Sequence, residues 1–251
     1  MPDITSFRVK IFADGANRAS ILELADNPWI RGFTTNPTLM RQAGVTDYEA
    51  FGKSLAHAIP ERPFSFEVLS DDFDEMERQA LRIAAWGENV YVKIPITDTR
   101  GRSAAALVER LAEQGVKINV TALMTLEQVD VVVPALRHGP PSCISIFAGR
   151  VADTGRDPLP ILCGALERIR AYPQVELIWA SPRELFNIVQ ADAIGCHIIT
   201  VTHDLLKKLS LLGRDLTGYS LDTVKMFVGD ARAANFTLEA PAPFDTVPSG
   251  G

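Results

Sequence analysis

Short apolar runs alternate along the chain with longer segments in which apolar residues recur at helical spacing. Eight of these runs are continuous enough to form strands that are buried on both faces, and they begin near Val9, Gly32, Phe64, Asn89, Lys117, Cys143, Val175 and Ile198. Segments between the runs, such as DEMERQALRIAAWG and SAAALVERLAEQG, have the periodicity of helices. Strands that alternate with helices predict a parallel sheet.

The number and spacing of the strands favour a closed barrel. The strand starts recur at intervals of roughly 30 residues, the size of a βαβ unit, and eight such units in 251 residues match a (β/α)8 barrel. A doubly wound open sheet is the alternative, but the turn ADGANRA after the first strand lacks GxGxxG, and no P-loop sequence occurs. We therefore predict an α/β protein with a single (β/α)8 (TIM) barrel.

Two features extend this prediction towards the C-terminus. The segment LDTVKMFVGDARAANF has an apolar face and is typical of an additional helix, so we assign residues 1–236 to one barrel domain that includes this helix. Residues 237–251 are rich in proline and small residues and are expected to be disordered. The helix can cap its own barrel or contact a second subunit, and the apolar pattern favours neither.

Composition narrows the classes of function. With 47% hydrophobic residues, the chain can enclose a large core. Its formal net charge of −6 argues against nucleic acid or an anionic membrane as the main partner, so an anionic substrate would need a local group of arginines. No run approaches the ~18 apolar residues of a membrane span, and the N-terminal sequence lacks the pattern of a signal peptide.

The cysteines and histidines do not suggest a metal site. Cys143, Cys163 and Cys196 are odd in number, widely spaced and in apolar surroundings, so we interpret them as reduced core residues of a cytoplasmic protein. No pair has CxxC spacing, and the histidines form neither HxH nor HExxH. We therefore expect chemistry that needs no metal.

Polar residues gather where the predicted strands end. Side chains along a barrel strand alternate between the interior and the helix layer, and chemistry in this fold occurs at the C-terminal mouth. Lys93 stands in the apolar run NVYVKIPIT, where an ammonium group is costly to bury unless it is paired or neutral. The other strands bring to the same mouth Asp14, Thr34, Asn36, Glu67, Asn119, Thr121, Ser145, Phe147, Arg150, Ser181 and Arg183.

Each of these residues also has a purely structural explanation. Asp14 and Ser181 could cap the helices that follow them, and Asn36 precedes a proline, which is ordinary in turns. Glu67 could do no more than neutralise Lys93, whose head group could instead reach water at the strand's edge. Independent structural roles would not bring acids, a lysine and two arginines to one mouth, so the convergence favours a functional site.

A buried lysine between carboxylates suits imine chemistry. A free lysine titrates near ~10.4 and is a poor nucleophile at neutral pH, but apolar walls disfavour its ammonium form. The neutral amine can attack a ketone to give an imine, and a protonated imine lets the neighbouring C–C bond break without a metal. The reaction also needs acid–base groups, and Asp14 and Glu67 fit these two roles.

Six motifs resemble, in order and spacing, those of the transaldolase family: ADGAN, TTNPT, VYVKIPIT, INVTALMT, SIFAGR and WASPR. The resemblance runs from about Arg8 to Phe236, and its most specific parts are TTNP and the VKIP lysine. The size is similar to that of the small subgroup, which includes fructose-6-phosphate aldolases. The resemblance implies a class I (β/α)8 enzyme that uses no metal or cofactor and acts on sugar phosphates, as in the pentose phosphate pathway.

The resemblance also implies a role for each residue. Lys93 would form the Schiff base with the donor ketose phosphate, and Asp14 would be the general acid/base at the cleaved bond. Glu67 and Thr121 would hold the catalytic water. Substrate contacts would come from Thr34, Asn36, Asn119, Ser145, Phe147, Arg150, Ser181 and Arg183. Arg150, Ser181 and Arg183 would bind the phosphate, as two guanidinium groups and a helix N-terminus can.

Two positions separate transaldolases from aldolases in this family. Aldolase members carry a tyrosine at the position of Phe147 and usually a glutamine at that of Glu67, so this chain has the transaldolase residues. A phenylalanine offers no proton to the carbanion, which would then wait for an aldehyde acceptor. Ile146, Ala148 and Pro182 depart from the family's pattern, so an enzyme of a specialised sugar pathway is an alternative.

Three alternatives to the transfer of a dihydroxyacetone unit stay open. Aldol cleavage could release free dihydroxyacetone, a phosphosugar isomerase could use Glu67 as base with Lys93 as an electrostatic group, and an inactive barrel could serve binding or structure. Small transaldolases form ring-shaped pentamers and decamers. The resemblance therefore implies a homo-oligomer in which the C-terminal helix packs on a neighbouring subunit.

Overall fold

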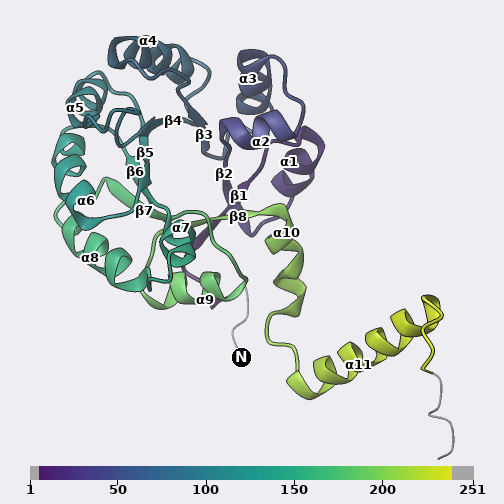
Figure 1. Ribbon diagram of the computed structural model, residues 1–251. Coiled ribbons are helices and arrows are strands. Elements are labelled where there is room, and N and C mark those ends of the chain that lie inside the picture. The colour runs from purple at the N-terminus through teal and green to yellow at the C-terminus, as the bar shows by residue number, and fades with distance from the viewer. Residues whose placement is uncertain (1–5, 239–251) are drawn as a thin grey trace, which may run out of the picture. The chain divides into compact units, whose positions relative to one another are not determined.

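The computed structural model describes residues 6–238. Within the part that ends at Leu212, a closed barrel of parallel strands forms the centre (Figure 1). The strands are β1 (Lys10–Asp14), β2 (Ile30–Thr34), β3 (Phe64–Glu67), β4 (Val90–Pro95), β5 (Ile118–Leu123), β6 (Ser142–Ile146), β7 (Val175–Trp179) and β8 (Ile198–Thr202). Neighbouring strands pair in chain order, and β8 returns to pair with β1. The predicted (β/α)8 barrel is confirmed, and an open doubly wound sheet is excluded.

Helices alternate with the strands and surround them in Figure 1. They are α1 (Arg18–Ala25), α2 (Pro37–Gln42), α3 (Tyr48–Ala58), α4 (Phe73–Ala84), α5 (Ala105–Glu113), α6 (Leu126–Val132), α7 (Ala148–Asp153), α8 (Leu159–Ile169), α9 (Phe186–Ala193) and α10 (His203–Leu206). The short 3₁₀ helices η2 (Pro134–Leu136) and η3 (Lys207–Leu211) follow α6 and α10. Helical periodicity decides which side packs inward: α4, for example, buries Met76, Ala80 and Ile83.

An apolar layer fills the barrel beneath its C-terminal mouth. It is a cluster separate from the larger core, formed by Phe12, Cys143, Ile178, Ala180 and Ile198. Gly32 leaves room for the Phe12 ring, because a Cβ at this position would lie 2.6 Å from the ring's Cζ. Phe12 stands two residues before Asp14 and therefore faces the same way. The polar groups at the mouth therefore lie directly above an apolar layer, which excludes water from that side of the site.

Contacts divide the described chain into a barrel unit that ends at Leu212 and a C-terminal unit that begins at Gly213. The second unit contains α11 (Leu216–Ala233), the additional helix predicted from the sequence. Asp215 caps it by accepting a hydrogen bond from the Gly218 backbone N–H at 2.7 Å. Of the tail predicted to be disordered, residues 239–251 lie outside the described residues.

The cysteines are free thiols, and two of them occupy the positions expected. Cys143 and Cys196 are buried, but Cys163 lies exposed on α8, so its interpretation as a core residue is wrong. The reason is helical periodicity, since α8 packs inward through Leu162 and Ala165, and Cys163 falls between the rows that face the barrel.

No helix among residues 6–238 combines the length and the apolar character that crossing a membrane requires.

Candidate active site

A cavity of about 540 Å³ opens at the C-terminal ends of the strands. All the site residues proposed from the sequence line it: Asp14, Thr34, Asn36, Glu67, Lys93, Asn119, Thr121, Ser145, Phe147, Arg150, Ser181 and Arg183. Its lining also includes residues of α2 and the two threonines of β8, Thr200 and Thr202, which the sequence did not predict. Residues that are far apart in the sequence, from Asp14 to Thr202, therefore meet at one mouth.

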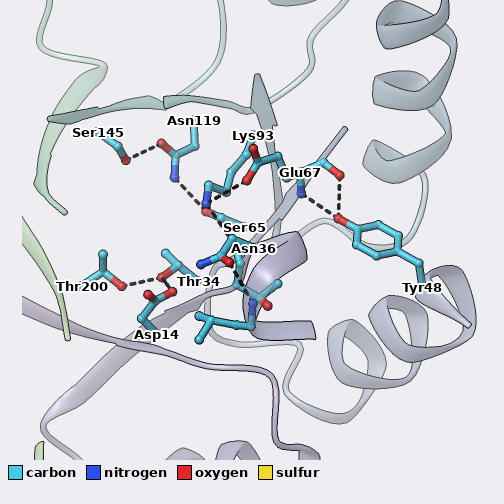
Figure 2. Close-up of polar contacts among 12 residues, drawn as sticks. Asp14, Thr34, Asn36, Tyr48, Ser65, Glu67, Lys93, Asn119, Ser145 and Thr200 are labelled. Carbon is cyan, nitrogen blue, oxygen red and sulfur yellow. Dashed lines mark hydrogen bonds and ion pairs between the residues drawn. The ribbon is translucent and has the colours of Figure 1, made fainter. Parts of the chain in front are cut away.

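Lys93 lies inside the barrel with 6% of its surface exposed. Its neighbours in β4, Val92 and Ile94, belong to the apolar core between the strands and the helices. The Lys93 Nζ donates a hydrogen bond to the Thr35 carbonyl oxygen at 2.9 Å and lies 3.3 Å from Oε2 of Glu67 (Figure 2). The head group is thus paired within the cavity, as a buried ammonium requires, and the alternative in which it reaches bulk water does not hold.

Glu67 is held from behind by a tyrosine of the helix layer. The register of β3 and β4 places Glu67 directly beside Lys93. The Tyr48 hydroxyl of α3 accepts a hydrogen bond from the Glu67 backbone N–H at 2.8 Å and donates one to the Glu67 carbonyl oxygen at 2.6 Å (Figure 2). Burial raises the pKa of the Tyr48 phenol above its ordinary value, so the hydroxyl keeps its proton. Tyr48 therefore fixes the backbone on both sides of Glu67, the last residue of β3.

Asp14 lies at the end of β1, where opposing effects act on its carboxyl. Burial raises the pKa of Asp14 above its ordinary value, while the positive charge of Lys93 and a hydrogen bond from Thr34 act against this rise. The negative charge of Glu67 raises the pKa further. The Thr34 Oγ1 donates to Asp14 Oδ1 at 2.7 Å and is also in contact with the hydroxyl of Thr200 (Figure 2). The carboxyl thus has an environment suited to a group that gains and loses a proton.

Two of the helices that follow site strands show which residues cap them. Asn17, not Asp14, caps α1 by accepting a hydrogen bond from the Ser20 backbone N–H at 3.0 Å, so the capping interpretation of Asp14 is wrong. Asn36 does cap α2, because its Oδ1 accepts from the Leu39 backbone N–H at 3.0 Å. The cap orients the Asn36 amide and leaves its NH₂ group as a donor for the cavity.

Asn119 is fully buried, and its amide has a fixed orientation. The Ser145 hydroxyl donates to Asn119 Oδ1 at 2.7 Å, and Asn119 Nδ2 donates to Ser65 Oγ at 3.1 Å (Figure 2). An amide nitrogen carries two protons, so one N–H of Asn119 is left for a ligand. Ser145 and Ser65 therefore position a hydrogen-bond donor in the cavity lining.

Thr121 lies within an irregular part of β5. The pairing of β5 with β6 shifts register between Val120 and Leu123, and Ala122 has a φ of 66°, which is uncommon for a residue with a side chain. The Thr121 hydroxyl is buried and has no hydrogen-bond partner among residues 6–238. A buried hydroxyl without a partner in a cavity lining is typical of a group that binds a ligand or water.

Arg150 and Arg183 bring positive charge to the cavity in different ways. The guanidinium carbon of Arg150, on α7, lies 5.8 Å from the centre of the Phe147 ring. The Arg183 Nε donates to Asp153 Oδ1 at 2.9 Å, and a second guanidinium nitrogen pairs with the other carboxylate oxygen. Arg183 therefore has a carboxylate partner that the sequence did not predict, whereas the Arg150 guanidinium lies against an aromatic ring.

Ser181 lies in a loop that packs tightly on α7. It has a φ of 61°, and Gly149 permits the approach, because a Cβ there would lie 1.6 Å from the Ser181 carbonyl oxygen. The next helix, α9, begins at Phe186, so Ser181 does not cap it, and Ser181 and Arg183 both precede its first turn, contrary to the expected helix N-terminus at the phosphate site. Instead, the Asn187 side chain accepts a hydrogen bond from the Arg183 backbone N–H at 2.8 Å. This loop, and not a helix N-terminus, brings Ser181 to the cavity.

The fold and the cavity define a class of protein by themselves. A lysine is shielded from water in a (β/α)8 barrel and paired with one carboxylate, and a second carboxylate across the cavity is held by a hydroxyl. Two arginines at the mouth suit an anionic group. Such an arrangement is typical of an enzyme whose side chains exchange protons with a small polar anion.

Comparison with known proteins names the family. The family described as transaldolase/fructose-6-phosphate aldolase matches residues 11–240. A "probable transaldolase" of Dehalococcoides mccartyi is 31% identical over 202 residues, which are 80% of this chain and 90% of that protein. A "probable transaldolase" of Streptococcus pyogenes serotype M5 is 34% identical over 203 residues, with the same shares covered. The chain therefore belongs to the transaldolase/fructose-6-phosphate aldolase family of enzymes.

Solved structures of other proteins share the fold at low sequence identity. The structure of 2,3-dimethylmalate lyase, a PEP mutase/isocitrate lyase superfamily member, has a TM-score of 0.52 and 11% identity, and the match covers 98% of this chain and 89% of that one. KGPDC from Streptococcus mutans also has a TM-score of 0.52, with 8% identity and coverage of 77% and 88%. Identities this low show a likeness of fold alone.

Three residues that hold site groups in place were missed from the sequence: Tyr48, Ser65 and Thr200. Ser65 stands two residues before Glu67 on the same strand, so strand alternation could have placed it inside the barrel. Thr200 lies in the run IITVT, whose β-branched residues predict a strand and do not single out one threonine. Tyr48 lies on a helix, and no local pattern connects it to Glu67.

Proposed function

We propose that this enzyme transfers a dihydroxyacetone unit from a ketose phosphate, such as fructose 6-phosphate, to an aldose phosphate through an imine on Lys93. The observation that carries the proposal is the setting of this amine. Lys93 is 6% exposed, and its Nζ lies 3.3 Å from a carboxylate that can take its proton. A neutral amine shielded from water is a nucleophile for a ketone.

The proposed reaction begins with attack of the Lys93 amine on the ketone carbon of the donor. The C–N bond forms, and one proton passes from the nitrogen to the former carbonyl oxygen to give a neutral carbinolamine. Glu67, together with a water held by the Thr121 hydroxyl, then delivers a second proton to this oxygen, which leaves as water. The product is a protonated imine. Its positive charge is adjacent to the carbon chain that is to be cleaved, so it can accept the electrons of the breaking bond.

Cleavage and transfer use Asp14 as base and then as acid. The Asp14 carboxylate takes the proton of the hydroxyl next to the bond between the third and fourth carbons, an aldehyde forms there, and the electrons of the broken bond give an enamine on Lys93. The enamine carbon then attacks the acceptor aldehyde, and Asp14 returns its proton to the new hydroxyl. Addition of water to the imine releases the product ketose and restores the amine.

The remaining polar residues suit the two ends of the donor. The amides of Asn36 and Asn119 each retain a donor for hydroxyl groups of the dihydroxyacetone unit. Arg150, Ser181 and Arg183 are proposed to bind the phosphate, since guanidinium groups form strong charge-assisted hydrogen bonds with it. Phe147 lacks the hydroxyl that would protonate the enamine, which favours transfer over release.

Chemical trapping of the imine tests this proposal. Borohydride added during turnover of fructose 6-phosphate is expected to reduce the imine and leave one three-carbon unit on the peptide that contains Lys93. Lys93→Met should give no adduct. Lys10→Met is the matched control, because Lys10 belongs to the opposite end of the barrel, where it pairs with Glu176, and this variant should be labelled like the original protein. Absence of an adduct under turnover conditions would refute the imine.

The fate of the three-carbon unit distinguishes the proposed transfer from its alternatives. With an aldose phosphate present, we expect a new ketose phosphate, and without an acceptor we expect little dihydroxyacetone. Release of dihydroxyacetone that is independent of acceptor would identify an aldolase. Exchange of solvent deuterium into the substrate without C–C cleavage would identify an isomerase that uses Glu67 as base.

We also propose a setting for the reaction. Free thiols at Cys143, Cys163 and Cys196 suit a reducing compartment such as the cytoplasm. The proposed steps need no metal, so activity should survive dialysis against EDTA. The substrates are proposed to be sugar phosphates of the pentose phosphate pathway or of a specialised sugar pathway. A panel in which the donor is fixed and the acceptor is varied will decide between these.

A further inference from the structure

Thr200 of β8 contributes a hydroxyl to the site that has no role in the reaction described above. It is 6% exposed and lines the cavity. Its Oγ1 is in hydrogen-bond contact with Oγ1 of Thr34, a residue 166 positions away along the chain. The Thr34 hydroxyl in turn donates to Asp14 Oδ1 at 2.7 Å. Figure 2 shows these side chains as a line that ends at the carboxyl.

The number of protons on Thr200, Thr34 and Asp14 decides which oxygen donates in each of these hydrogen bonds. A threonine hydroxyl carries one proton, and an ionised carboxylate is only an acceptor. When Asp14 is ionised, the single Thr34 proton goes to Asp14, so the contact between the threonines is a hydrogen bond only if Thr200 is the donor. When Asp14 is protonated, it can donate to Thr34, and both hydrogen bonds can reverse. Both hydrogen bonds can therefore form whether Asp14 is ionised or protonated, as an acid/base requires.

We propose that Thr200 is a positioning residue for Asp14 that acts through Thr34, by keeping the Thr34 hydroxyl directed as a donor towards the carboxylate. The inference rests on the proposed role of Asp14 as the acid/base. Thr34 is itself 3% exposed, so water cannot readily replace Thr200 as the donor to its oxygen. Hydrogen bonds in such a chain strengthen one another, so the loss of Thr200 weakens the bond that favours the Asp14 carboxylate.

The charged groups round Asp14 do not depend on Thr200. Lys93 and Glu67 act on the carboxyl through their charges, with opposite effects on its pKa. The helix α10 also contacts β1, and it carries the titratable residues His203 and Asp204. Replacement of Thr200 by valine keeps the shape and removes only the hydroxyl, so a change in the titration of Asp14 would report on the hydrogen-bonded line.

The experiment compares Thr200→Val with Thr200→Ser, which retains a hydroxyl, and with Thr202→Val, the same substitution two residues along the same strand and in the same cavity lining. Asp14 is titrated by carbon NMR of labelled aspartate carboxyls, with its signal assigned by Asp14→Asn. This readout needs no turnover. We expect the midpoint to rise by roughly 0.5 pH unit in Thr200→Val and to stay unchanged in the other two variants.

Activity provides a second readout of the same group. A base must be ionised, so the acid limb of the pH profile of kcat/KM should move to higher pH in Thr200→Val by the same amount as the NMR midpoint. A merely structural role would lower kcat/KM at all pH values and leave the limb in place. In a Thr34→Val background, a further Thr200→Val change should produce no additional shift, because Thr200 acts through Thr34.

An Asp14 midpoint that is equal in the wild-type protein and Thr200→Val would overturn the proposal, as would an equal shift in Thr202→Val. If Thr200→Val fails to fold, Thr200→Ser is the test. A substantial shift of the Asp14 midpoint in Thr200→Ser would contradict a role that needs only the hydroxyl. Failure of the proposed function is recognised separately, by the absence of a borohydride adduct on Lys93 in the wild-type protein.

Discussion

Asp14 lies in a barrel interior that disfavours its charge, and Lys93 and Thr34 offset only part of this effect, so its pKa is raised. A carboxyl whose pKa is higher in the folded state binds its proton more tightly there than in the unfolded chain. It therefore weakens the fold at pH values above the folded pKa. The penalty vanishes as the pH falls below the unfolded value of 3.8, because both states are then neutral.

Replacement of Asp14 by asparagine should therefore separate stability from activity. We expect Asp14→Asn to raise the unfolding temperature at pH 7, because the variant buries no charge at this position, and to abolish transfer. The gain should shrink as the pH falls through the folded pKa of Asp14. Thermal unfolding from pH 3 to pH 8 measures this, with Asp204→Asn as a control at an exposed carboxylate. A loss of stability at pH 7 would contradict the prediction.

Arg150 is expected to contribute more to phosphate binding than Arg183, because the Arg183 guanidinium already pairs with Asp153. Loss of a charge-assisted hydrogen bond costs about 1.5 to 3 kcal/mol, so Arg150→Ala should raise the KM of fructose 6-phosphate by roughly 10- to 100-fold. The KM of a donor without phosphate should not change. Steady-state kinetics with both donors test this, and Arg156→Ala is the control at a nearby exposed arginine. An equal effect on both donors would show that Arg150 does not bind the phosphate.

At the scale of elements, α3 secures the end of β3 through a single hydroxyl. Tyr48→Phe would leave the Glu67 backbone N–H and carbonyl without their partner, at a cost of about 1 to 3 kcal/mol in unfolding free energy. Because Glu67 is proposed to act in carbinolamine breakdown, the variant should also form the borohydride-trapped imine more slowly. Chemical denaturation and the time course of trapping measure the two effects.

Tyr172→Phe provides the matched control for this prediction. Tyr172 is a partly buried tyrosine that packs against the core away from β3, so loss of its hydroxyl should leave the rate of trapping unchanged. A Tyr48→Phe variant that loses stability but traps imine at the normal rate would show that the hydroxyl stabilises β3 without positioning Glu67.

The elements also show how far the sequence could predict the site. Alternation along each strand depends only on backbone geometry, so the positions of Lys93 and Asn119 in the cavity lining were predicted, whereas those of Thr200 and Thr202 were not. The conformation of the loop after β7 was not predicted, because the φ of Ser181 and its contact with Gly149 depend on tertiary packing. Thr200 was missed because its partner is 166 residues away, and no local period encodes such a pair.

For the whole molecule, the helix α11 is distinguished by the apolar side chains that it exposes. Its large exposed apolar side chains include Leu216, Tyr219, Leu221, Val224, Met226, Phe227 and Val228. Of these, Val224, Phe227 and Val228 recur at spacings of three and four residues, so they share one face. Most of the stability of a helix in a protein comes from the packing of its apolar face, and contiguous exposed apolar surface is typical of an interface.

We predict that this face binds a second copy of the chain, because its side chains are apolar and exposed and because members of the small transaldolase subgroup, which this sequence resembles, assemble into rings. Phe227→Asp should then weaken self-association at least 30-fold, because an aspartate would replace about 2 kcal/mol or more of apolar contact. Light scattering across a dilution series measures the self-association.

Gly229→Asp is the control. Two residues along a helix correspond to a rotation of about 200°, so this variant puts the same charge on the opposite face. A wild-type chain that is monomeric at all concentrations would contradict the prediction and favour a helix that covers its own barrel.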